Sequence, residues 1–329
     1  MLFEEVNVAV DSGKGFSKFL VRDAVTKEYK KSVFPTKIQK VNNIGFDLST
    51  NSYQVEYDGE IYLIGDMLTN LVNTDLTKKT KEHLLCIYLS VVNAIKLSNS
   101  KKAGIYRVNL SLNTPLTIFK NKKLKDEYEQ FIRQNGGTIH FTLNGEHFLF
   151  KIQNLFLLQE GIGSLFLRPD YKNKNVVQID IGTLNVTVNS FLSLIPQLDS
   201  NFSNSYGTNS LFSTLRERLS MDYGVTVHYK DLEQIIKDRV LIVEGERMLD
   251  SSVIIEEIME NHAKQIMASV KAQVSLNNTE ISFVGGGSIL LYEQLKKLVP
   301  QATFEPDPQF CSLNSFYRIM EAKLHAQRL

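Results

Sequence analysis

Two glycine-containing turns in this sequence each follow an apolar strand that ends in aspartate. The first turn runs from Asp11 to Lys18, and the second runs from Asp180 to Thr187. Glycine lacks a Cβ, so it adopts positive φ without steric cost and lets backbone N–H groups approach an anion closely. The two turns therefore predict a pair of phosphate-binding hairpins in two similar half-domains.

A carboxylate at the end of each strand would by itself repel a polyphosphate. Bound Mg²⁺ removes this conflict, because hard carboxylate oxygens hold the ion through its waters while the ion bridges phosphate oxygens. We therefore interpret Asp11 and Asp180 as acids on the magnesium side of the site. Aspartate and glycine are also favoured in turns whatever the function, so one hairpin alone would be weak evidence.

A third glycine turn, Gly285-Gly286-Gly287-Ser288, lies between an apolar strand at 281–284 and an amphipathic helix expected at 289–298. The N-terminus of a helix presents unpaired N–H groups and the positive end of the helix dipole. A plain strand-to-helix connection rarely needs three successive glycines, since each one costs chain entropy on folding. This turn therefore indicates a third ligand-binding loop.

The order of these motifs resembles that of the actin-like ATPases, and most closely that of the ParM-type filament proteins that segregate plasmids. The family's first phosphate loop, D-x-G-x-G-x-x-K, fits Asp11 to Lys18, and its second, D-x-G-[ST], fits Asp180 to Thr183. The glycine turn on the adenosine side fits Val284 to Ser288. The resemblance extends from end to end of the chain, although only these loops and one acidic segment are specific.

The acidic segment is Gln159-Glu160-Gly161-Ile162-Gly163-Ser164, which is similar to the family's P-E-G-x-G-[AS] at the start of a helix. The resemblance implies that Glu160 orients the attacking water. An acid in the first turn of a helix is also favoured by the helix dipole. Gln159 replaces the usual proline and Asn185 replaces a hydroxyl residue, so hydrolysis could be slow even where binding survives.

The resemblance implies catalytic roles for Glu160, Asp180 and Asp11, with both aspartates binding magnesium through water. It assigns nucleotide contacts to the three loops and to a Gly-Thr pair that precedes a helix in the second half. These contact positions are Ser12, Gly13, Lys14, Gly15, Lys18, Gly182, Thr183, Leu184, Asn185, Gly207, Thr208, Gly285, Gly286, Gly287 and Ser288. An ordinary helix N-cap explains Gly207 and Thr208 equally well.

Apolar periodicity predicts the elements that must position these loops. Two-residue hairpin turns are expected at Asp58-Gly59 and Asn144-Gly145. Strands are expected at 6–10, 16–21, 107–112, 138–143 and 146–150, and helices at about 80–97, 124–134, 231–240 and 251–274, with Gly136 ending the second helix.

The predicted fold class is α/β, and the resemblance implies an actin-like ATPase fold in which two duplicated mixed-sheet domains flank a nucleotide cleft. The first domain is expected at 1–170, with a small insert at about 26–75, and is completed by 308–329. The second domain is expected at 171–307.

Composition indicates a soluble globular protein, because 43% of the 329 residues are hydrophobic and 22% are charged. A net charge of +1 argues against direct binding to duplex DNA, which usually requires a strong basic excess. Solvated helix faces explain the lysine-rich stretches. Their members are Lys96, Lys101, Lys102, Lys120, Lys122, Lys123 and Lys125.

Cys86 and Cys311 provide no disulfide framework, which favours a reducing compartment. The first residues lack a signal-peptide pattern, and no stretch approaches the ~20 apolar residues of a membrane span. We therefore expect a cytoplasmic protein with no membrane partner. His140 and His147 have no cysteine or carboxylate cluster around them, so we expect structural roles for both.

The resemblance implies hydrolysis of ATP, or of GTP, with Mg²⁺ as cofactor. It also implies assembly of the protein with itself into polar filaments, and a centromere-binding adaptor protein through which plasmid DNA is engaged only indirectly. The alternative is a sugar-kinase-like phosphotransferase of the same superfamily acting on a small metabolite. That enzyme would need a carboxylate base, for which Asp66 and Asp199 stay open.

Overall fold

The computed structural model describes residues 3–45, 47–69, 77–162, 165 and 168–328. The chain divides into two compact units, which are considered separately below. The amino-terminal unit comprises Met1–Leu167 and Ser312–Leu329, and the carboxy-terminal unit comprises Arg168–Cys311. The chain therefore passes from one unit to the other twice.

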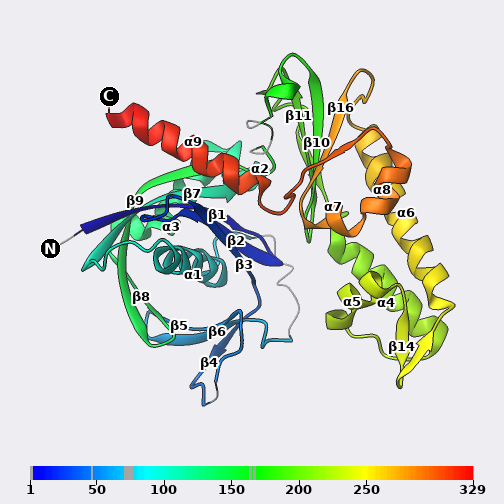
Figure 1. The fold of residues 1–329 in the computed structure, drawn as a ribbon, viewed down its shortest axis with the longest axis horizontal. Helices are drawn as coiled ribbons and strands as arrows, with labels where there is room; N and C mark the ends of the chain where they lie inside the picture. The colour runs from blue at the N-terminus through cyan, green and yellow to red at the C-terminus, as the bar shows by residue number, and fades with distance from the viewer. Residues whose placement is uncertain (1–2, 46, 70–76, 163–164, 166–167, 329) are drawn as a thin grey trace. The chain divides into compact units, whose positions relative to one another are not determined.

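A mixed sheet forms the centre of the amino-terminal unit, and its nine described strands follow the order β3-β2-β1-β7-β9-β8-β5-β6-β4. The strands are β1 (Phe3–Ser12), β2 (Phe16–Arg22), β3 (Tyr29–Pro35), β4 (Ile38–Val41), β5 (Ser52–Tyr57), β6 (Glu60–Gly65), β7 (Ile105–Thr114), β8 (Ile139–Leu143) and β9 (Glu146–Gln159). Its helices are α1 (Lys81–Leu97), α2 (Leu116–Phe119), α3 (Lys122–Arg133) and α9 (Cys311–Arg328). The sheet curves around α1 (Figure 1).

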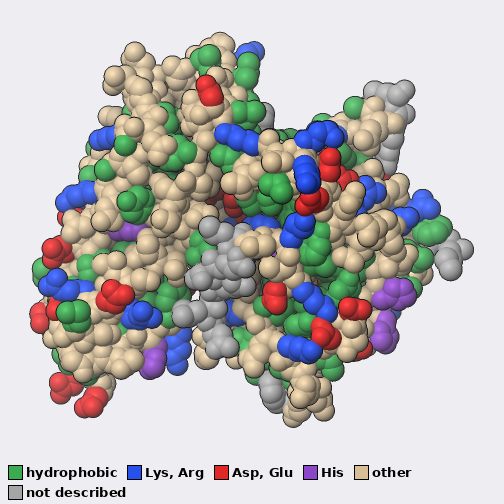
Figure 2. Space-filling view, turned by 180° about the vertical axis from the view of Figure 1, so that it is seen from behind, with side chains coloured by type: hydrophobic (Ala, Val, Ile, Leu, Met, Phe, Trp, Pro, Cys, Tyr) green, Lys and Arg blue, Asp and Glu red, His purple; other side chains and the backbone are tan. Residues whose placement is uncertain are grey.

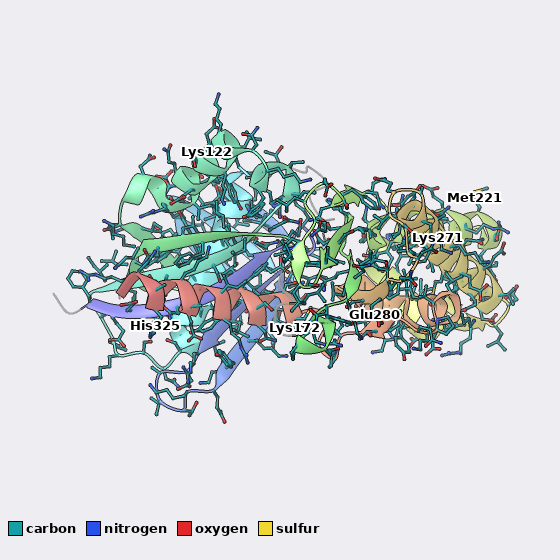
Figure 3. The ribbon with its side chains drawn as sticks, turned by 90° about the horizontal axis from the view of Figure 1, so that it is seen from above. Lys122, Lys172, Met221, Lys271, Glu280 and His325 are labelled. Atoms are coloured by element: carbon teal, nitrogen blue, oxygen red, sulfur yellow. The ribbon has the colours of Figure 1, made fainter. Side chains whose placement is uncertain are left out.

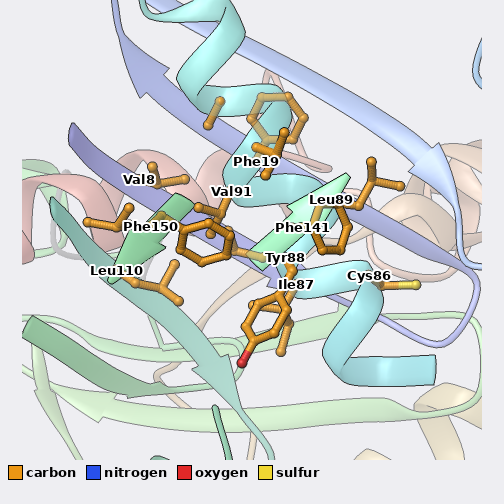
Figure 4. Packing of buried hydrophobic residues seen from close by; sticks show 14 of the residues in the cluster. Val8, Phe19, Cys86, Ile87, Tyr88, Leu89, Val91, Leu110, Phe141 and Phe150 are labelled. Atoms are coloured by element: carbon orange, nitrogen blue, oxygen red, sulfur yellow. The ribbon is translucent and has the colours of Figure 1, made fainter. Parts of the chain in front are cut away.

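Helix α1 is buried on nearly every side, which explains its almost continuous apolar sequence. Figure 4 shows side chains of α1, including Tyr88 and Val91, packed among residues of the surrounding strands. Val8 of β1, Leu110 of β7 and Phe150 of β9 are each 0% exposed in this core. The same packing holds the carboxyl ends of β1 and β7 in parallel register, so residues at those ends share one edge of the sheet.

Helix α9 packs on the amino-terminal unit through aromatic and charged contacts. The rings of Tyr317 and Tyr29 meet edge to face with their centroids 5.3 Å apart. Lys323 lies 5.7 Å above the ring of Phe156 on β9. These contacts join the last helix to strands at the beginning and the middle of the sequence.

The carboxy-terminal unit has a second mixed sheet with the strand order β12-β11-β10-β16-β17, and β13 pairs with β11. The strands are β10 (Asn175–Ile181), β11 (Val186–Leu192), β12 (Ile195–Pro196), β13 (Phe202–Asn204), β16 (Glu280–Val284) and β17 (Thr303–Phe304), with a separate hairpin of β14 (Leu241–Val243) and β15 (Glu246–Met248). The helices are α4 (Thr208–Tyr223), α5 (Leu232–Asp238), α6 (Ser251–Lys271), α7 (Gly286–Leu290) and α8 (Tyr292–Leu298). Its core joins Ile179, Val188, Leu215 and Met259, all 0% exposed.

Several predicted elements have different ends in the structure. Helix α3 ends at Arg133, within one residue of the predicted end at about 134. Its C-cap is Gln134 in a left-handed conformation with φ 47°, and not the expected Gly136. The helix expected at 289–298 begins earlier, at Gly286, and is interrupted at Leu291. Strand β9 continues to Gln159, because its pairing with β7 persists through a bulge to the end of both strands.

Charged side chains of both signs are interspersed over the face of the molecule shown in Figure 2, in keeping with the net charge of +1. Lys122 in α3 extends away from the ribbon (Figure 3), and its side chain is 91% exposed. It pairs with Asp126 one helical turn later, which fits the interpretation of a solvated helix face. None of the helices in the described ranges is both long and apolar enough for a bilayer span.

Candidate functional site

The two Asp-x-Gly hairpins have the same backbone geometry. The Gly13 N–H donates to the Phe16 carbonyl at 3.0 Å, and the Gly182 N–H donates to the Asn185 carbonyl at 2.9 Å. The aspartates are also equivalent, because Asp11 pairs with Lys18 across one hairpin and Asp180 pairs with Thr187 across the other. Each first strand has a parallel neighbour, β7 in one unit and β16 in the other. The structure thus repeats the same motif at the centre of each sheet.

In the first hairpin, Lys18 forms an ion pair with Asp11. The distance from Lys18 Nζ to Asp11 Oδ2 is 3.2 Å, and the two side chains are 15% and 20% exposed. Both groups are therefore largely shielded from bulk water while still accessible to a small ligand. The lysine predicted to contact phosphate and the aspartate predicted to hold magnesium lie side by side in this unit.

Ser12 follows Asp11 and hydrogen-bonds in several directions. Its N–H donates to Asn113 Oδ1 at 3.1 Å, and its carbonyl accepts a bond from Lys78 Nζ at 2.7 Å. Its hydroxyl lies 3.0 Å from Ser17 Oγ and 3.4 Å from His83 Nδ1. Ser12 is fully buried, so its backbone and hydroxyl act as fixed internal contacts of the hairpin.

Glu160 lies in a turn directly after β9, at the same edge of the sheet as Asp11. Its N–H donates to the Thr114 carbonyl at 2.9 Å, and its Oε1 lies 3.5 Å from Asn113 Nδ2. Burial raises the pKa of Glu160; the charge of Lys78 opposes this shift and that of Asp11 adds to it. Asn113 thus bridges the proposed water-positioning acid and the first hairpin.

The expectation that Glu160 begins a helix is not met in the residues that the structure describes, where Glu160 and Gly161 form a turn. Gly163 and Ser164, which complete the motif, lie outside the described residues.

Two polar residues of this region were missed by sequence reasoning. Lys78 is 8% exposed, and burial lowers the pKa of its ammonium group, against the opposing charges of Glu160 and Asp11. It comes from a polar stretch, Thr77-Lys78-Lys79-Thr80, in which nothing distinguishes a buried lysine from an exposed one. The sequence did contain an indication that Asn113 lies near the site, because it is near the end of β7, the strand that runs parallel to β1.

His83 is buried behind the first hairpin. Its Nε2 lies 2.7 Å from the hydroxyl of Tyr128, and its Nδ1 faces Ser12. Burial, together with the positive charges of Lys78 and Lys14, holds the pKa of His83 well below its usual range. This imidazole is therefore neutral at pH 7.

The remaining residues of the first loop contact two segments, the one that precedes α1 and the one that follows β3. Lys14 Nζ donates to the Thr77 carbonyl at 2.9 Å, and the Gly15 carbonyl accepts the N–H of Thr36 at 3.0 Å. A small surface hollow opens beside this loop. Its lining residues are Ser12, Gly13, Lys14, Thr36, Ile38, Thr80, Glu82, His83 and Cys86.

In the carboxy-terminal unit, the start of α4 binds the second hairpin. The Thr208 N–H donates to the Gly182 carbonyl at 3.0 Å, and the Asn209 N–H donates to the Thr183 carbonyl at 2.8 Å. Gly207 is the N-cap residue and makes no side-chain cap. A Cβ at Gly207 would stand 2.5 Å from the Thr183 carbonyl oxygen, so this position requires glycine. The N–H groups of Thr208 and Asn209 therefore hold the second hairpin in place. This role differs from the nucleotide contact and from the ordinary helix N-cap that the sequence left open for Gly207 and Thr208.

The triple-glycine turn also packs against the second hairpin. Gly285 has φ 84° and ψ 164°, a region that is essentially restricted to glycine. A Cβ there would overlap Asp180 Oδ1 and stand 2.5 Å from the Ile181 carbonyl, and one at Gly287 would enter the Ile181 side chain. Ser288 Oγ donates back to the Gly285 carbonyl at 2.7 Å. At least two of the three glycines are therefore required for packing on the hairpin that bears Asp180.

The donor chemistry of the two hairpins fits Mg²⁺ held through water. Each hairpin offers one hard carboxylate, and the residues described contain no gathering of three or more His, Cys, Asp or Glu side chains that would form a complete cage. Mg²⁺ usually keeps several waters and combines one or two carboxylates with substrate phosphates. Each aspartate, taken within its own hairpin, therefore suits a hard cation held through water.

Comparison with known families supports the class of fold. A model of the N-terminal domain of actin-like proteins matches residues 9–163, and a model of the C-terminal domain of the archaeal actin homologue MreB-like proteins matches residues 176–297. Together they span most of the chain. No curated protein sequence matches the chain.

Solved structures agree over nearly the whole length. The chain is similar to Ta0583, an archaeal actin homologue, with 18% identity and a TM-score of 0.78 over 96% of this chain and 99% of that one. It is also similar to ParM in a 15-stranded filament from Clostridium botulinum, with 16% identity and a TM-score of 0.80 over 97% and 99%. A third is Alp12 in a filament structure, with 25% identity and a TM-score of 0.68 over 98% and 99%.

Both units, with their repeated central hairpins, define the fold of the actin homologues. The chain belongs to the family of actin-like proteins. ParM structures are among the solved structures that are similar to it.

Proposed function

We propose that this protein is a nucleoside triphosphatase that binds ATP or GTP with Mg²⁺ and assembles with itself into nucleotide-dependent filaments. The observation that carries the proposal is the equivalence of the two hairpins, each of which presents an aspartate beside a glycine turn. In each unit the motif suits contact with a polyphosphate through glycine N–H groups beside a carboxylate. The complex of Ta0583 with ADP and the filament structures of ParM and Alp12 support this inference.

In this proposal the hairpins bind the phosphates through backbone N–H groups, with Lys18 as a cationic contact. Asp11 and Asp180 would hold Mg²⁺ through water, and the ion would neutralise phosphate charge. Glu160 would orient the attacking water for in-line displacement. Asn113 would hold the Glu160 carboxylate in place, since its amide lies 3.5 Å from Oε1.

The adenosine side of the nucleotide would lie against the turn at Gly285–Ser288. Subunits joined head to tail would form a heterologous contact that does not close into a ring. We further propose a role in plasmid segregation, in the cytoplasm, through a centromere-binding adaptor protein. Mixed surface charge and a net charge of +1 suit indirect engagement of DNA better than direct binding.

Polymerisation tests the proposal directly. The purified protein is mixed with Mg-ATP or Mg-GTP and followed by light scattering, sedimentation and negative-stain microscopy, with released phosphate measured in parallel. We expect sedimenting filaments with a nucleoside triphosphate and none after EDTA, and a double Asp11→Asn, Asp180→Asn variant as control should stay in the supernatant. A monomer that transfers phosphate to a sugar would refute the filament proposal and favour the kinase alternative.

A further inference from the structure

Two lysines exchange hydrogen bonds between the first hairpin and the segment that leads into α1. Lys78 Nζ donates to the Ser12 carbonyl at 2.7 Å, and Lys14 Nζ donates to the Thr77 carbonyl at 2.9 Å. The Lys78 bond is buried, whereas the Lys14 bond is exposed. Thr80 caps α1 only two residues after Lys78. The beginning of α1 is thus tied to the hairpin at residue 12.

The position of Lys78 is unusual for a lysine. Lysine side chains are almost never fully buried unless they are paired, because an ammonium group loses its hydration there. Lys78 is 8% exposed, and burial lowers the pKa of its ammonium group while the carboxylates of Glu160 and Asp11 act to raise it. These are the two carboxylates of this unit that the proposed function places near phosphate.

A polyphosphate adds negative charge to a place that already contains two acids. Lys18 forms an ion pair with Asp11, which offsets one of them. Lys78 adds a second cation that interacts electrostatically with both acids. Its ammonium group is held in place by the hydrogen bond to the Ser12 carbonyl. A fixed charge in a water-poor site acts more strongly than a solvated one.

We propose that Lys78 is a positioning residue of the phosphate site, which holds the Ser12 carbonyl of the first hairpin and balances the charge of Asp11 and Glu160 so that both can face a polyphosphate. The charge-balancing part rests on the proposed function. The tether to Ser12 does not, because it is present without nucleotide.

The test compares Lys78→Met, Lys78→Gln and Lys78→Arg with Lys79→Met. Lys79 is the matched control, because it is the next residue, is 42% exposed and pairs with Glu127 on α3, away from the hairpin. Gln keeps an N–H donor, one atom closer to the backbone, but carries no charge, whereas Arg keeps the charge. The first readout is amide hydrogen exchange of residues 12–18 without nucleotide. The second is the dissociation constant for Mg-ATP by calorimetry, with kcat measured separately.

We expect Lys78→Met to speed exchange in residues 12–18, because the hydrogen bond to the Ser12 carbonyl is lost. It should also weaken Mg-ATP binding by about tenfold or more, because a fixed positive charge is removed from the site. Lys78→Gln should restore slow exchange but not affinity, and Lys78→Arg should restore part of the affinity. Lys79→Met should match the wild type in both readouts.

The outcomes separate this inference from the proposed function. If Lys78→Met behaves like Lys79→Met in both exchange and affinity, the positioning role is wrong. If the wild type binds no nucleotide while Lys78→Met still exchanges faster, the proposed function fails and the tether stands. If Lys78→Met does not fold, Lys78→Gln is compared with Lys79→Gln instead. Equal dissociation constants for Mg-ATP in these two variants would overturn the charge-balancing role.

Discussion

Gly285 lies directly against Asp180, so closely that a Cβ on Gly285 would overlap the carboxylate oxygen Oδ1. We expect Gly285→Ala to lower the free energy of unfolding by roughly 2–4 kcal/mol, because overpacking adds to the strain of a backbone conformation that only glycine adopts readily. Urea unfolding followed by circular dichroism measures the change. Gly245→Ala is the matched control, since Gly245 also has positive φ, at 90°, but has open space around it. Equal losses in the two variants would show that packing on Asp180 contributes nothing.

Glu160→Gln should slow phosphate release by about 100-fold or more while leaving the Mg-ATP dissociation constant within about threefold, since general acid–base groups typically contribute 10²–10⁴-fold. Gln preserves the size of the side chain and an oxygen that can accept from Asn113. Glu146→Gln, at the exposed start of the same strand, serves as control. Unchanged turnover in Glu160→Gln would remove Glu160 from the mechanism.

Asp180→Asn should abolish most of the magnesium dependence of nucleotide binding, because an amide oxygen is a poorer partner for hydrated Mg²⁺ than a carboxylate. Titration with ATP in Mg²⁺ and again in EDTA measures the ratio of the two dissociation constants. We expect this ratio to fall at least about tenfold, the equivalent of 1.4 kcal/mol. A ratio equal to that of the wild type would contradict the assignment of Asp180 to the metal.

The buried imidazole of His83 should make the fold less stable in mild acid. Its pKa is held well below 6.5 in the folded protein, so below pH 6.5 the unfolded chain binds the proton more readily than the folded chain does. The stabilising contribution of the neutral imidazole is therefore present above pH 6.5 and is lost as pH falls below it, by at most about 1.4 kcal/mol per pH unit.

Urea unfolding at intervals from pH 7.5 to pH 5 measures this slope, and His83→Gln should make it shallower. His262 in the carboxy-terminal unit also has a lowered pKa through burial, so His262→Gln should remove a separate part of the same dependence. A slope that neither substitution changes would show that other groups titrate in this range.

The sequence predicted the fold and the order of the loops because the chemistry of a glycine hairpin is local. An apolar strand, an aspartate and a glycine within a few residues determine the turn, and the structure has the same hydrogen bond at Gly13 and at Gly182. Helix α1 was predicted for a similar reason, since its apolar residues recur continuously and Thr80 caps it. The roles assigned to the individual loop residues stay predictions.

The features that escaped prediction depend on contacts between distant segments. Lys78 donates to the Ser12 carbonyl of the first hairpin, 66 residues away along the chain, and no neighbour in the sequence indicates this contact. The triple glycine was read as a ligand-binding turn, whereas its contacts with Asp180 and Ile181 give Gly285 and Gly287 a packing role that only pairing of β10 with β16 reveals. The predicted end of α3 lay within one residue of Arg133, but a left-handed Gln134 caps the helix in place of the expected Gly136.

Helix α9 completes the unit to which the first strand belongs, whereas Arg168–Cys311 is one unbroken stretch of chain. Domains generally acquire structure as units while the ribosome delivers them from the amino end. The carboxy-terminal unit can therefore close during synthesis as soon as its own segment has emerged. The strands of the amino-terminal unit are translated first, but this unit completes its fold later. The contact between the rings of Tyr29 and Tyr317 can form only after Tyr317 has been translated.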